Sequence, residues 1–174
     1  MNNKYPILDV CCGPKSMWFD KDNPLTLYVD KRMEVIKSNL PGRSPWAILP
    51  NIVCDFTRLP FHNDLFHLVC FDPPHLSTLG KNAHMAKRYG RLFPNWDIEI
   101  KAGFDECWRV LISMGILIFK WNETEIPLKR IIGLAPSYPL FGHTTNQKRN
   151  THWITFIKAN KRLSIDGAKG RATS

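Results

Sequence analysis

Residues 66–75 have the sequence Phe-His-Leu-Val-Cys-Phe-Asp-Pro-Pro-His, and the fold assignment starts from this stretch. Its first six residues form an apolar run typical of a buried β-strand, which ends at the acid Asp72. Proline lacks an N–H, fixes its own φ and pushes the preceding residue out of the helical region. We therefore expect an extended edge with two acceptors, the Asp72 carboxylate and the Pro73 carbonyl, which together could hold both hydrogens of an –NH2 group.

Further apolar runs predict the rest of a sheet. Strands are expected at residues 5–11, 25–29, 52–54, 66–71, 116–119, 139–142 and 153–157; helices are expected at residues 33–40, from 94–97 to Gly115, and at 126–134. The first strands are continuous apolar runs separated by helices, which is typical of a parallel α/β sheet with helices on both faces. Only a polar loop separates the last two strands, so we expect them to form an antiparallel hairpin at the sheet edge.

Composition narrows the class of protein. The chain has 174 residues, enough for one domain, and no apolar run long enough to cross a bilayer. The first six residues lead directly into a strand and do not resemble a signal peptide. The five cysteines are odd in number and form no Cys-x-x-Cys pair, which indicates reduced thiols in a cytoplasmic protein and neither a disulfide framework nor a metal site.

The charge distribution favours a polyanionic partner. The chain carries 24 Lys and Arg against 15 Asp and Glu, a net charge of +9. Between residues 77 and 96 there are four basic residues and no acid, interleaved with aromatic side chains. The substrate-binding candidates in this stretch are Lys81, Lys87, Arg88, Tyr89 and Arg91. Such a segment suits phosphate contacts and base stacking beside the Asp-Pro-Pro-His stretch, although a solvated loop is an open alternative.

Acids follow four of the expected strands: Asp9, Asp30, Asp55 and Asp72. Ligands of open parallel sheets bind outside the carboxyl ends of the strands, so these acids would share one crevice. Asp30 lies about 20 residues after Asp9, a spacing suited to binding ribose hydroxyls. The turn after the first strand contains only Gly13 and lacks the further glycines of a pyrophosphate cradle. We therefore expect a nucleoside ligand without a phosphate.

In these features the chain resembles the class I S-adenosylmethionine-dependent methyltransferases. The segments that carry the resemblance are Leu-Asp-Val-Cys-Cys-Gly at 8–13, Tyr-Val-Asp at 28–30, Cys-Asp-Phe-Thr-Arg-Leu-Pro-Phe at 54–61, Phe-Asp-Pro-Pro-His at 71–75 and Arg-Val-Leu-Ile-Ser-Met-Gly-Ile-Leu-Ile at 109–118. They occur in the family's order and cover residues 7–119. The resemblance implies a Rossmann-like methyltransferase domain at residues 1–160. Residues 161–174 are polar and basic and contain glycine, so we expect a disordered tail there.

The resemblance also implies roles for individual residues. Those expected to bind the cofactor are Asp9, Cys11, Cys12 and Gly13 at its methionine part, Asp30 at the ribose hydroxyls, and Asp55 and Phe56 at the adenine. Asp72, Pro73, Pro74 and His75 resemble the catalytic motif of amino-methyltransferases that act on adenine or cytosine. The chain departs from the family pattern at Lys15, where glycine is common, and at His75, where an aromatic residue is usual; it also lacks a target-recognition domain.

The sequence thus predicts an S-adenosylmethionine-dependent enzyme that methylates an exocyclic amino group of DNA or RNA. Adenine N6 is favoured over cytosine N4, and a partner subunit could supply target recognition. A second reading is N-methylation of a protein amide or a small molecule. A third is a non-catalytic subunit of the same fold that binds nucleic acid or a partner protein. A different use of the cofactor, such as its cleavage, also stays open.

Overall fold

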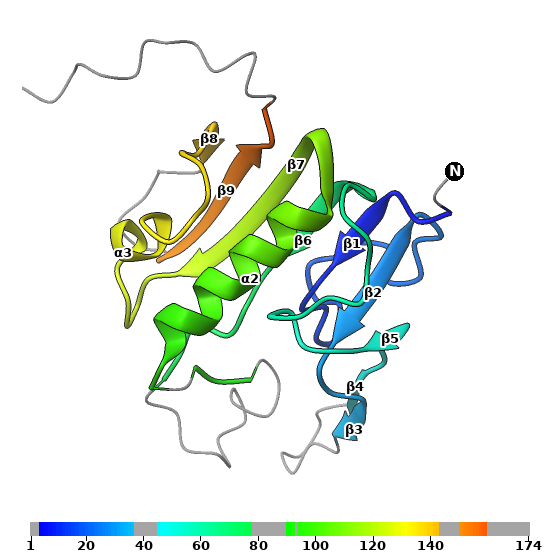
Figure 1. The fold of residues 1–174 in the computed structure, drawn as a ribbon. Helices are drawn as coiled ribbons and strands as arrows, with labels where there is room; N and C mark the ends of the chain where they lie inside the picture. The colour runs from blue at the N-terminus through cyan, green and yellow to red at the C-terminus, as the bar shows by residue number, and fades with distance from the viewer. Residues whose placement is uncertain (1–3, 37–44, 78–89, 93, 143–149, 160–174) are drawn as a thin grey trace, which may run out of the picture.

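The computed structural model describes residues 4–36, 45–77, 90–92, 94–142 and 150–159. The elements of this part of the chain are β1 (Ile7–Asp9), β2 (Thr26–Asp30), β3 (Glu34–Ile36), β4 (Trp46–Ile48), β5 (Ile52–Val53), β6 (Phe66–Phe71), α2 (Trp96–Val110), β7 (Leu111–Asn122), α3 (Leu128–Ile132), β8 (Phe141–Gly142) and β9 (Thr151–Ile157). Seven of these strands form one sheet in the order β5-β2-β1-β6-β7-β9-β8 (Figure 1). The first five are parallel, and β9 is antiparallel to both β7 and β8. The predicted mostly parallel sheet with an antiparallel edge hairpin is confirmed.

The strand order reverses direction at β1. From β1 the chain proceeds to β2 and β5 on one side, and then returns to place β6 and β7 on the other side. Such a switch point opens a crevice between the carboxyl ends of the two central strands. Asp9 ends β1 and Asp72 directly follows β6, so both acids lie at this crevice.

Helix α2 covers one face of the sheet and supplies the centre of the core (Figure 1). The Phe104 ring lies 5.4 Å from that of Phe71 and 4.7 Å from that of Phe119, measured between centroids. A Cβ added at Gly103 would lie 2.6 Å from Phe71 and 2.7 Å from Phe56. The glycine therefore allows the helix to approach closely enough to hold Phe56 against the carboxyl edge of the sheet.

Two charged residues of α2 fix the loop that carries Phe56. Glu106 pairs with Arg109 at 2.7 Å and accepts a hydrogen bond from the backbone N–H of Leu59 at 2.7 Å. Arg109 in turn donates to the carbonyl oxygens of Leu59 and Phe61. The hydrogen bond from Arg109 lowers the pKa of Glu106, so this carboxylate stays ionised at neutral pH.

Strand β7 extends further than its neighbour β6. Pairing between these strands ends at Phe71 and Phe119. Strand β7 continues to Asn122, and its residues 116–122 all pair with β9. The three residues beyond β6 therefore form a two-stranded ribbon with β9 that rises above the carboxyl edge of the sheet. We call this part of β7 and β9 the overhang, residues 120–122 and 151–153.

The predicted helix at 33–40 is wrong over its described part. Residues 34–36 form strand β3, which pairs antiparallel with β4. Val35 and Ile36 are β-branched, which favours extended backbone, and the Asp30 side chain turns the chain by accepting the Arg32 N–H at 2.9 Å. Described residues 10–25, between β1 and β2, contain no helix.

The predicted helix end at Gly115 is also wrong. Helix α2 ends at Val110 and β7 begins at the next residue, so Gly115 lies inside the strand. The pairing with β6 shifts register there, and Met114 has a φ of 62°. Gly115 thus marks a bulge, a position where strand glycines are common.

Most of the predicted basic segment (Lys81, Lys87, Arg88 and Tyr89) and the tail at 161–174 lie outside the described residues. Among the described helices, none combines the length and apolar character needed to cross a bilayer. The five cysteines are free, with Cys12, Cys70 and Cys107 buried.

Candidate active site

A cleft with a volume of about 430 Å³ lies at the carboxyl edge of the sheet, over the switch point. It is lined by residues 10–14, 16–17, 30–32, Phe56, 72–75, Gly90, Lys120, Asn122, Thr151 and Trp153. One end is formed by the segments after β1 and β2, and the other by the segment after β6 together with the overhang. The expected catalytic motif and most of the expected cofactor residues therefore share one cleft.

Asp72 is held by a lysine that the sequence analysis did not select. Lys120 Nζ lies 2.5 Å from Asp72 Oδ2, and both side chains are partly exposed. The register explains this contact: Phe71 pairs with Phe119 in parallel strands, which places the next residues, Asp72 and Lys120, side by side. The ion pair fixes one carboxylate oxygen of Asp72 and leaves Oδ1 as the further acceptor.

The rest of the motif also lies at the cleft. Pro73, Pro74 and His75 line it, and residues 72–76 are extended or irregular, as the two prolines predict. The His75 ring meets Trp121 edge-on, with centroids 6.2 Å apart and planes at 73°. Burial lowers the pKa of His75 and Lys120 lowers it further, while Asp72 opposes the shift. The imidazole is therefore neutral at neutral pH.

The loop after β1 adopts the backbone conformation that glycines favour. Gly13 has a φ of 48° and Lys15 a φ of 53°. The Lys15 side chain turns away from the cleft: its Nζ donates to the Lys21 carbonyl at 2.8 Å and lies 4.0 Å from the Tyr28 ring centroid. Lys15 therefore keeps the glycine-like loop shape without filling the cleft.

Asp30 connects this loop to β2. Its Oδ2 accepts the Gly13 N–H at 2.9 Å, and its Oδ1 accepts the backbone N–H of Arg32 at 2.9 Å. Asp30 lines the cleft although it is largely buried. Since a carboxylate oxygen accepts up to two hydrogen bonds, Oδ2 has capacity for a ligand hydroxyl.

Asp9 lies beneath the loop and is fully buried. Its Oδ2 accepts the Trp18 indole N–H at 2.7 Å, and its Oδ1 accepts the Cys11 N–H at 3.2 Å. Burial raises the pKa of Asp9 to about 7, with smaller contributions from Asp72 and Asp30. Asp9 is not among the described residues that line the cleft. Its contacts are those of a residue that holds the loop in place.

The two residues expected to bind adenine, Phe56 and Asp55, also differ in whether they line the cleft. Phe56 lines the cleft and packs on Phe71, with ring centroids 5.3 Å apart. The Asp55 carboxylate accepts both the backbone N–H and the hydroxyl of Thr57 at 2.9 Å, and Asp55 is not among the described lining residues. Cys11 and Cys12 line the cleft beside Gly13, and burial raises the pKa of both thiols.

Sequence reasoning missed the overhang side of the cleft. Its residues are Lys120, Asn122, Thr151 and Trp153. A usable signal existed for Lys120, the single charge in the otherwise apolar run of residues 115–121. Of the predicted substrate-binding residues, only Arg91 lies in the described part of the chain, and it does not line the cleft.

The chain matches no protein-family model and no curated protein. Among solved structures, the PH0226 protein of Pyrococcus horikoshii OT3 aligns with a TM-score of 0.55 at 15% identity, covering 87% of this chain and 80% of the other. An S-adenosylmethionine-dependent methyltransferase of Methanosarcina mazei aligns with a TM-score of 0.55 at 13% identity, covering 91% and 94%. A putative methyltransferase of Haloferax volcanii, in complex with its Trm112 activator, aligns with a TM-score of 0.50 at 11% identity, covering 92% and 86%. The chain thus has the fold found in these proteins, which include the methyltransferases of Methanosarcina mazei and Haloferax volcanii.

Proposed function

We propose that this protein is an S-adenosylmethionine-dependent N-methyltransferase whose target is an exocyclic amino group of a nucleic-acid base. The observation that carries the proposal is the shared cleft: Asp72 and Pro73 line it at one end, and Asp30 and Gly13 line it at the other. The residues proposed to bind the amine thus line the same cleft as the carboxylate proposed to bind the nucleoside. The fold shared with known methyltransferases supports this assignment.

The residues present fit the cofactor. A volume of about 430 Å³ is within the range of small-molecule sites, and the end near β2 combines a carboxylate, an aromatic ring and exposed loop backbone. Asp30 would bind the ribose hydroxyls, Phe56 would contact the adenine ring, and residues 11–13 would face the methionine part. Asp9 would act through the loop, because its carboxylate already holds Trp18 and Cys11.

S-adenosylmethionine would supply an electrophilic methyl group on a sulfonium sulfur; when the methyl is transferred, its bond to sulfur breaks and S-adenosylhomocysteine is released. The protein's part is to present the amine, whose lone pair is delocalised into the base and must be freed to form the new N–C bond. Asp72 Oδ1 and the Pro73 carbonyl would each accept one amino hydrogen, which draws the nitrogen toward tetrahedral geometry. The proton lost from the methylated nitrogen would pass to Asp72 or to solvent. Catalysis would consist of positioning and electrostatic stabilisation.

The charge of the chain supports a nucleic-acid substrate over a small molecule. The net charge of +9 attracts a polyanion, and four basic residues lie between 77 and 96 with no acid among them. One described residue of this segment, Gly90, lines the cleft, and nearby the Leu92 N–H donates to the carbonyl of Leu76, which directly follows the motif, at 2.9 Å. We favour adenine N6 over cytosine N4, in a single strand or a flipped-out base.

The test is methyl transfer from labelled cofactor to single-stranded DNA, duplex DNA and RNA, followed by nucleoside analysis. The proposal expects N6-methyladenine or N4-methylcytosine in at least one substrate. Calorimetry with S-adenosylmethionine and S-adenosylhomocysteine would test the cofactor separately. Cofactor binding without transfer to any nucleic acid would reject the substrate class, and no cofactor binding would reject the proposal as a whole.

A partner subunit for target recognition is part of the proposal. The Haloferax volcanii protein of the same fold is in complex with an activator, which is a precedent for such an arrangement. A requirement for a partner would appear as cofactor binding with slow, sequence-independent transfer by the isolated chain.

A further inference from the structure

We propose that Trp153, on strand β9, is the surface on which the ring of the target base stacks. This inference rests on the proposed function and adds a substrate-binding residue that the catalytic motif does not contain. The other candidate for this role is His75, at the fourth position of the motif, where the family usually has an aromatic residue.

The strand register gathers four side chains into one patch. Lys120 lies opposite Trp153, and Asn122 lies opposite Thr151. Residues two apart on a strand point to the same face, so these two cross-strand pairs form a patch on one face of the overhang. All four residues line the cleft.

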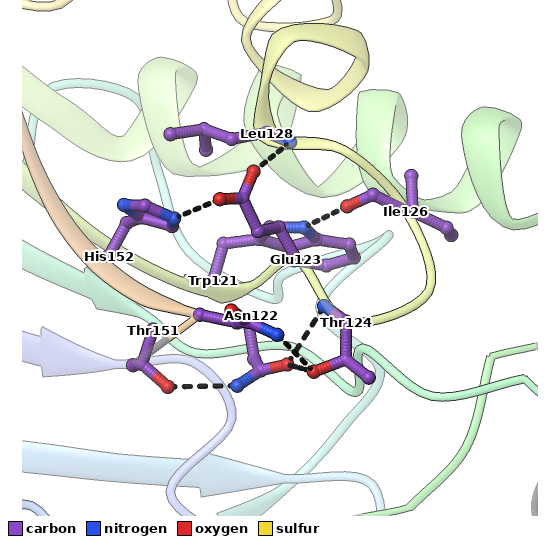
Figure 2. Close-up of polar contacts among 9 residues, drawn as sticks. Trp121, Asn122, Glu123, Thr124, Ile126, Leu128, Thr151 and His152 are labelled. Carbon is purple, nitrogen blue, oxygen red and sulfur yellow. Dashed lines mark hydrogen bonds and ion pairs between the residues drawn. The ribbon is translucent and has the colours of Figure 1, made fainter. Parts of the chain in front are cut away.

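The alternate residues of the overhang point to the other face. Trp121 is fully buried, stacks on Phe119 and donates its indole N–H to the Ile126 carbonyl at 3.0 Å. His152 lies 2.8 Å from Glu123, whose other oxygen accepts the Leu128 N–H (Figure 2). These contacts hold the back of the overhang against α3 and so fix the direction in which the patch faces.

His75 is poorly placed to stack on a base. Its ring already meets that of Trp121 edge-on, with the ring centroids 6.2 Å apart, and the His75 side chain is partly buried. Trp153, by contrast, is 40% exposed although it is a large aromatic side chain. Trp153 therefore offers a larger and more exposed aromatic surface at the cleft than His75 does.

Lys120 places this ring near the reacting group. Its Nζ lies 2.5 Å from Asp72 Oδ2 and 5.6 Å from the centroid of the Trp153 ring. One side chain therefore contacts both the carboxylate that would hold the amino group and the tryptophan. A flat base has its amino group in the ring plane, so Asp72 would bind its edge while Trp153 covers its face.

The remaining two residues offer hydrogen-bond donors. Asn122 Oδ1 accepts from the N–H and hydroxyl of Thr124 at 3.0 and 2.6 Å, which sets the amide orientation. Its Nδ2 donates to the Thr151 hydroxyl oxygen at 2.9 Å (Figure 2). Within the described part of the chain, the second N–H of Asn122 and the O–H of Thr151 make no further hydrogen bond, and such donors suit the ring nitrogens of adenine or the carbonyl oxygen and ring nitrogen of cytosine.

The experiment compares Trp153→Ala, Trp153→Leu and Trp153→Phe with the wild type, using single-stranded oligo(dA), oligo(dC), oligo(rA) and oligo(rC) as methyl acceptors. Base–aromatic stacking contributes about 1–3 kcal/mol, so we expect KM for the oligonucleotide to rise about 5- to 150-fold in the alanine and leucine variants. The phenylalanine variant should recover most of this loss. The Kd for S-adenosylmethionine should change by less than about 2-fold in all three, which also reports that they are folded.

Phe141→Ala is the matched control, because Phe141 is a 65% exposed aromatic residue on neighbouring β8 and does not line the cleft. Its KM should equal that of the wild type. An unchanged KM in Trp153→Leu, or an equal rise in Phe141→Ala, overturns the stacking site while leaving the proposed function standing. If the wild type binds the cofactor and methylates none of the four acceptors, the proposed function fails and the stacking site fails with it.

Discussion

Asp9 and Asp72 lie at the carboxyl ends of adjacent parallel strands, and their surroundings differ in almost every respect. Asp9 is fully buried under the loop after β1, where its two oxygens accept hydrogen bonds from Trp18 and Cys11. Asp72 lies at the cleft beside Lys120, with its side chain partly exposed. Burial raises the pKa of Asp9 to about 7, and the nearby Asp72 adds to this shift.

The comparison shows that an acid at a strand end is not by itself a ligand-binding group. The loop after β1 folds back over Asp9 and uses its carboxylate as an anchor. The two prolines after Asp72 disfavour a helical turn back over the carboxylate, the chain at 72–76 is irregular, and Asp72 lines the cleft. The residues that follow the acid therefore decide which role it takes.

The largest expected effect comes from Asp72→Ala. Removing a group that acts on the reacting atoms costs about 10²–10³-fold in rate, and we expect kcat for methyl transfer to fall by that factor. The Kd for S-adenosylmethionine should stay within about 3-fold of the wild type, since Asp30 and Gly13 are untouched. Asp105→Ala, which removes the exposed ion pair with Lys101, is the control and should leave kcat unchanged. Full activity of Asp72→Ala would refute the catalytic role.

Asp9→Asn should change the pH dependence of stability. The folded protein keeps the Asp9 proton up to about pH 7, whereas the unfolded chain releases it near 3.8, so Asp9 makes the wild type less stable as pH rises between these values. At 1.36 kcal/mol per pH unit, this loss amounts to about 2–3 kcal/mol from pH 5 to pH 8. The Asp9→Asn variant has no carboxyl proton to lose at this position, so this pH-dependent loss of stability is absent.

Urea denaturation of both proteins at about pH 5 and about pH 8 measures this difference, because titrations elsewhere in the chain cancel between them. If the free energy of unfolding changes equally with pH in both, Asp9 is ionised in the folded protein and the contrast with Asp72 disappears.

Lys120→Met tests whether the ion pair positions Asp72. The pair is partly exposed and we expect a moderate effect, a fall in kcat of about 10-fold, because the carboxylate loses the cation that fixes one of its oxygens. Lys120→Arg should restore part of the activity, and cofactor affinity should not change. If Lys120→Met is faster than the wild type, Lys120 instead competes with the substrate amine for Asp72.

Lys15→Gly should have the smallest effect. The φ of 53° at this position suits glycine, and the Lys15 side chain points to Tyr28 and away from the cleft. We expect a Kd for S-adenosylmethionine within about 2-fold of the wild type and a change of less than about 1 kcal/mol in the free energy of unfolding. A large change in Kd would place the Lys15 ammonium at the cofactor.

The sequence predicted the parts of the fold that local pattern determines. Buried parallel strands are apolar on both faces, so β1, β2 and β6 stand out as short apolar runs that end in an acid. The segment at 33–40 failed because Met33, Val35 and Ile36 fit a helical spacing equally well, and only pairing with β4 makes residues 34–36 a strand. The helix end at Gly115 failed because glycine can mark either a helix stop or a strand bulge.

The residues of the site divide in the same way, into those that the local sequence indicates and those that depend on pairing between distant strands. Asp30 and Asp72 could be selected because Asp30 ends β2 and Asp72 directly follows β6, and Phe56 because it lies in a segment that resembles the methyltransferase family. Lys120 and Trp153 were missed because their meeting depends on the antiparallel register of β7 and β9, which lie about thirty residues apart in the chain. The burial of Asp9 depends in turn on how residues 10–18 fold over it, which no local pattern specifies.

The overhang of β7 and β9 also limits how this site can change in evolution or by design. Inserting one residue before Lys120 would reverse the alternation, turning Lys120 and Asn122 toward α3 and exposing Trp121. Inserting two residues in each strand would keep both faces and raise the wall by about 7 Å. The depth of the acceptor site can therefore be altered only in steps of two residues, made in both strands together. Each step would change the size of the group that can reach Asp72.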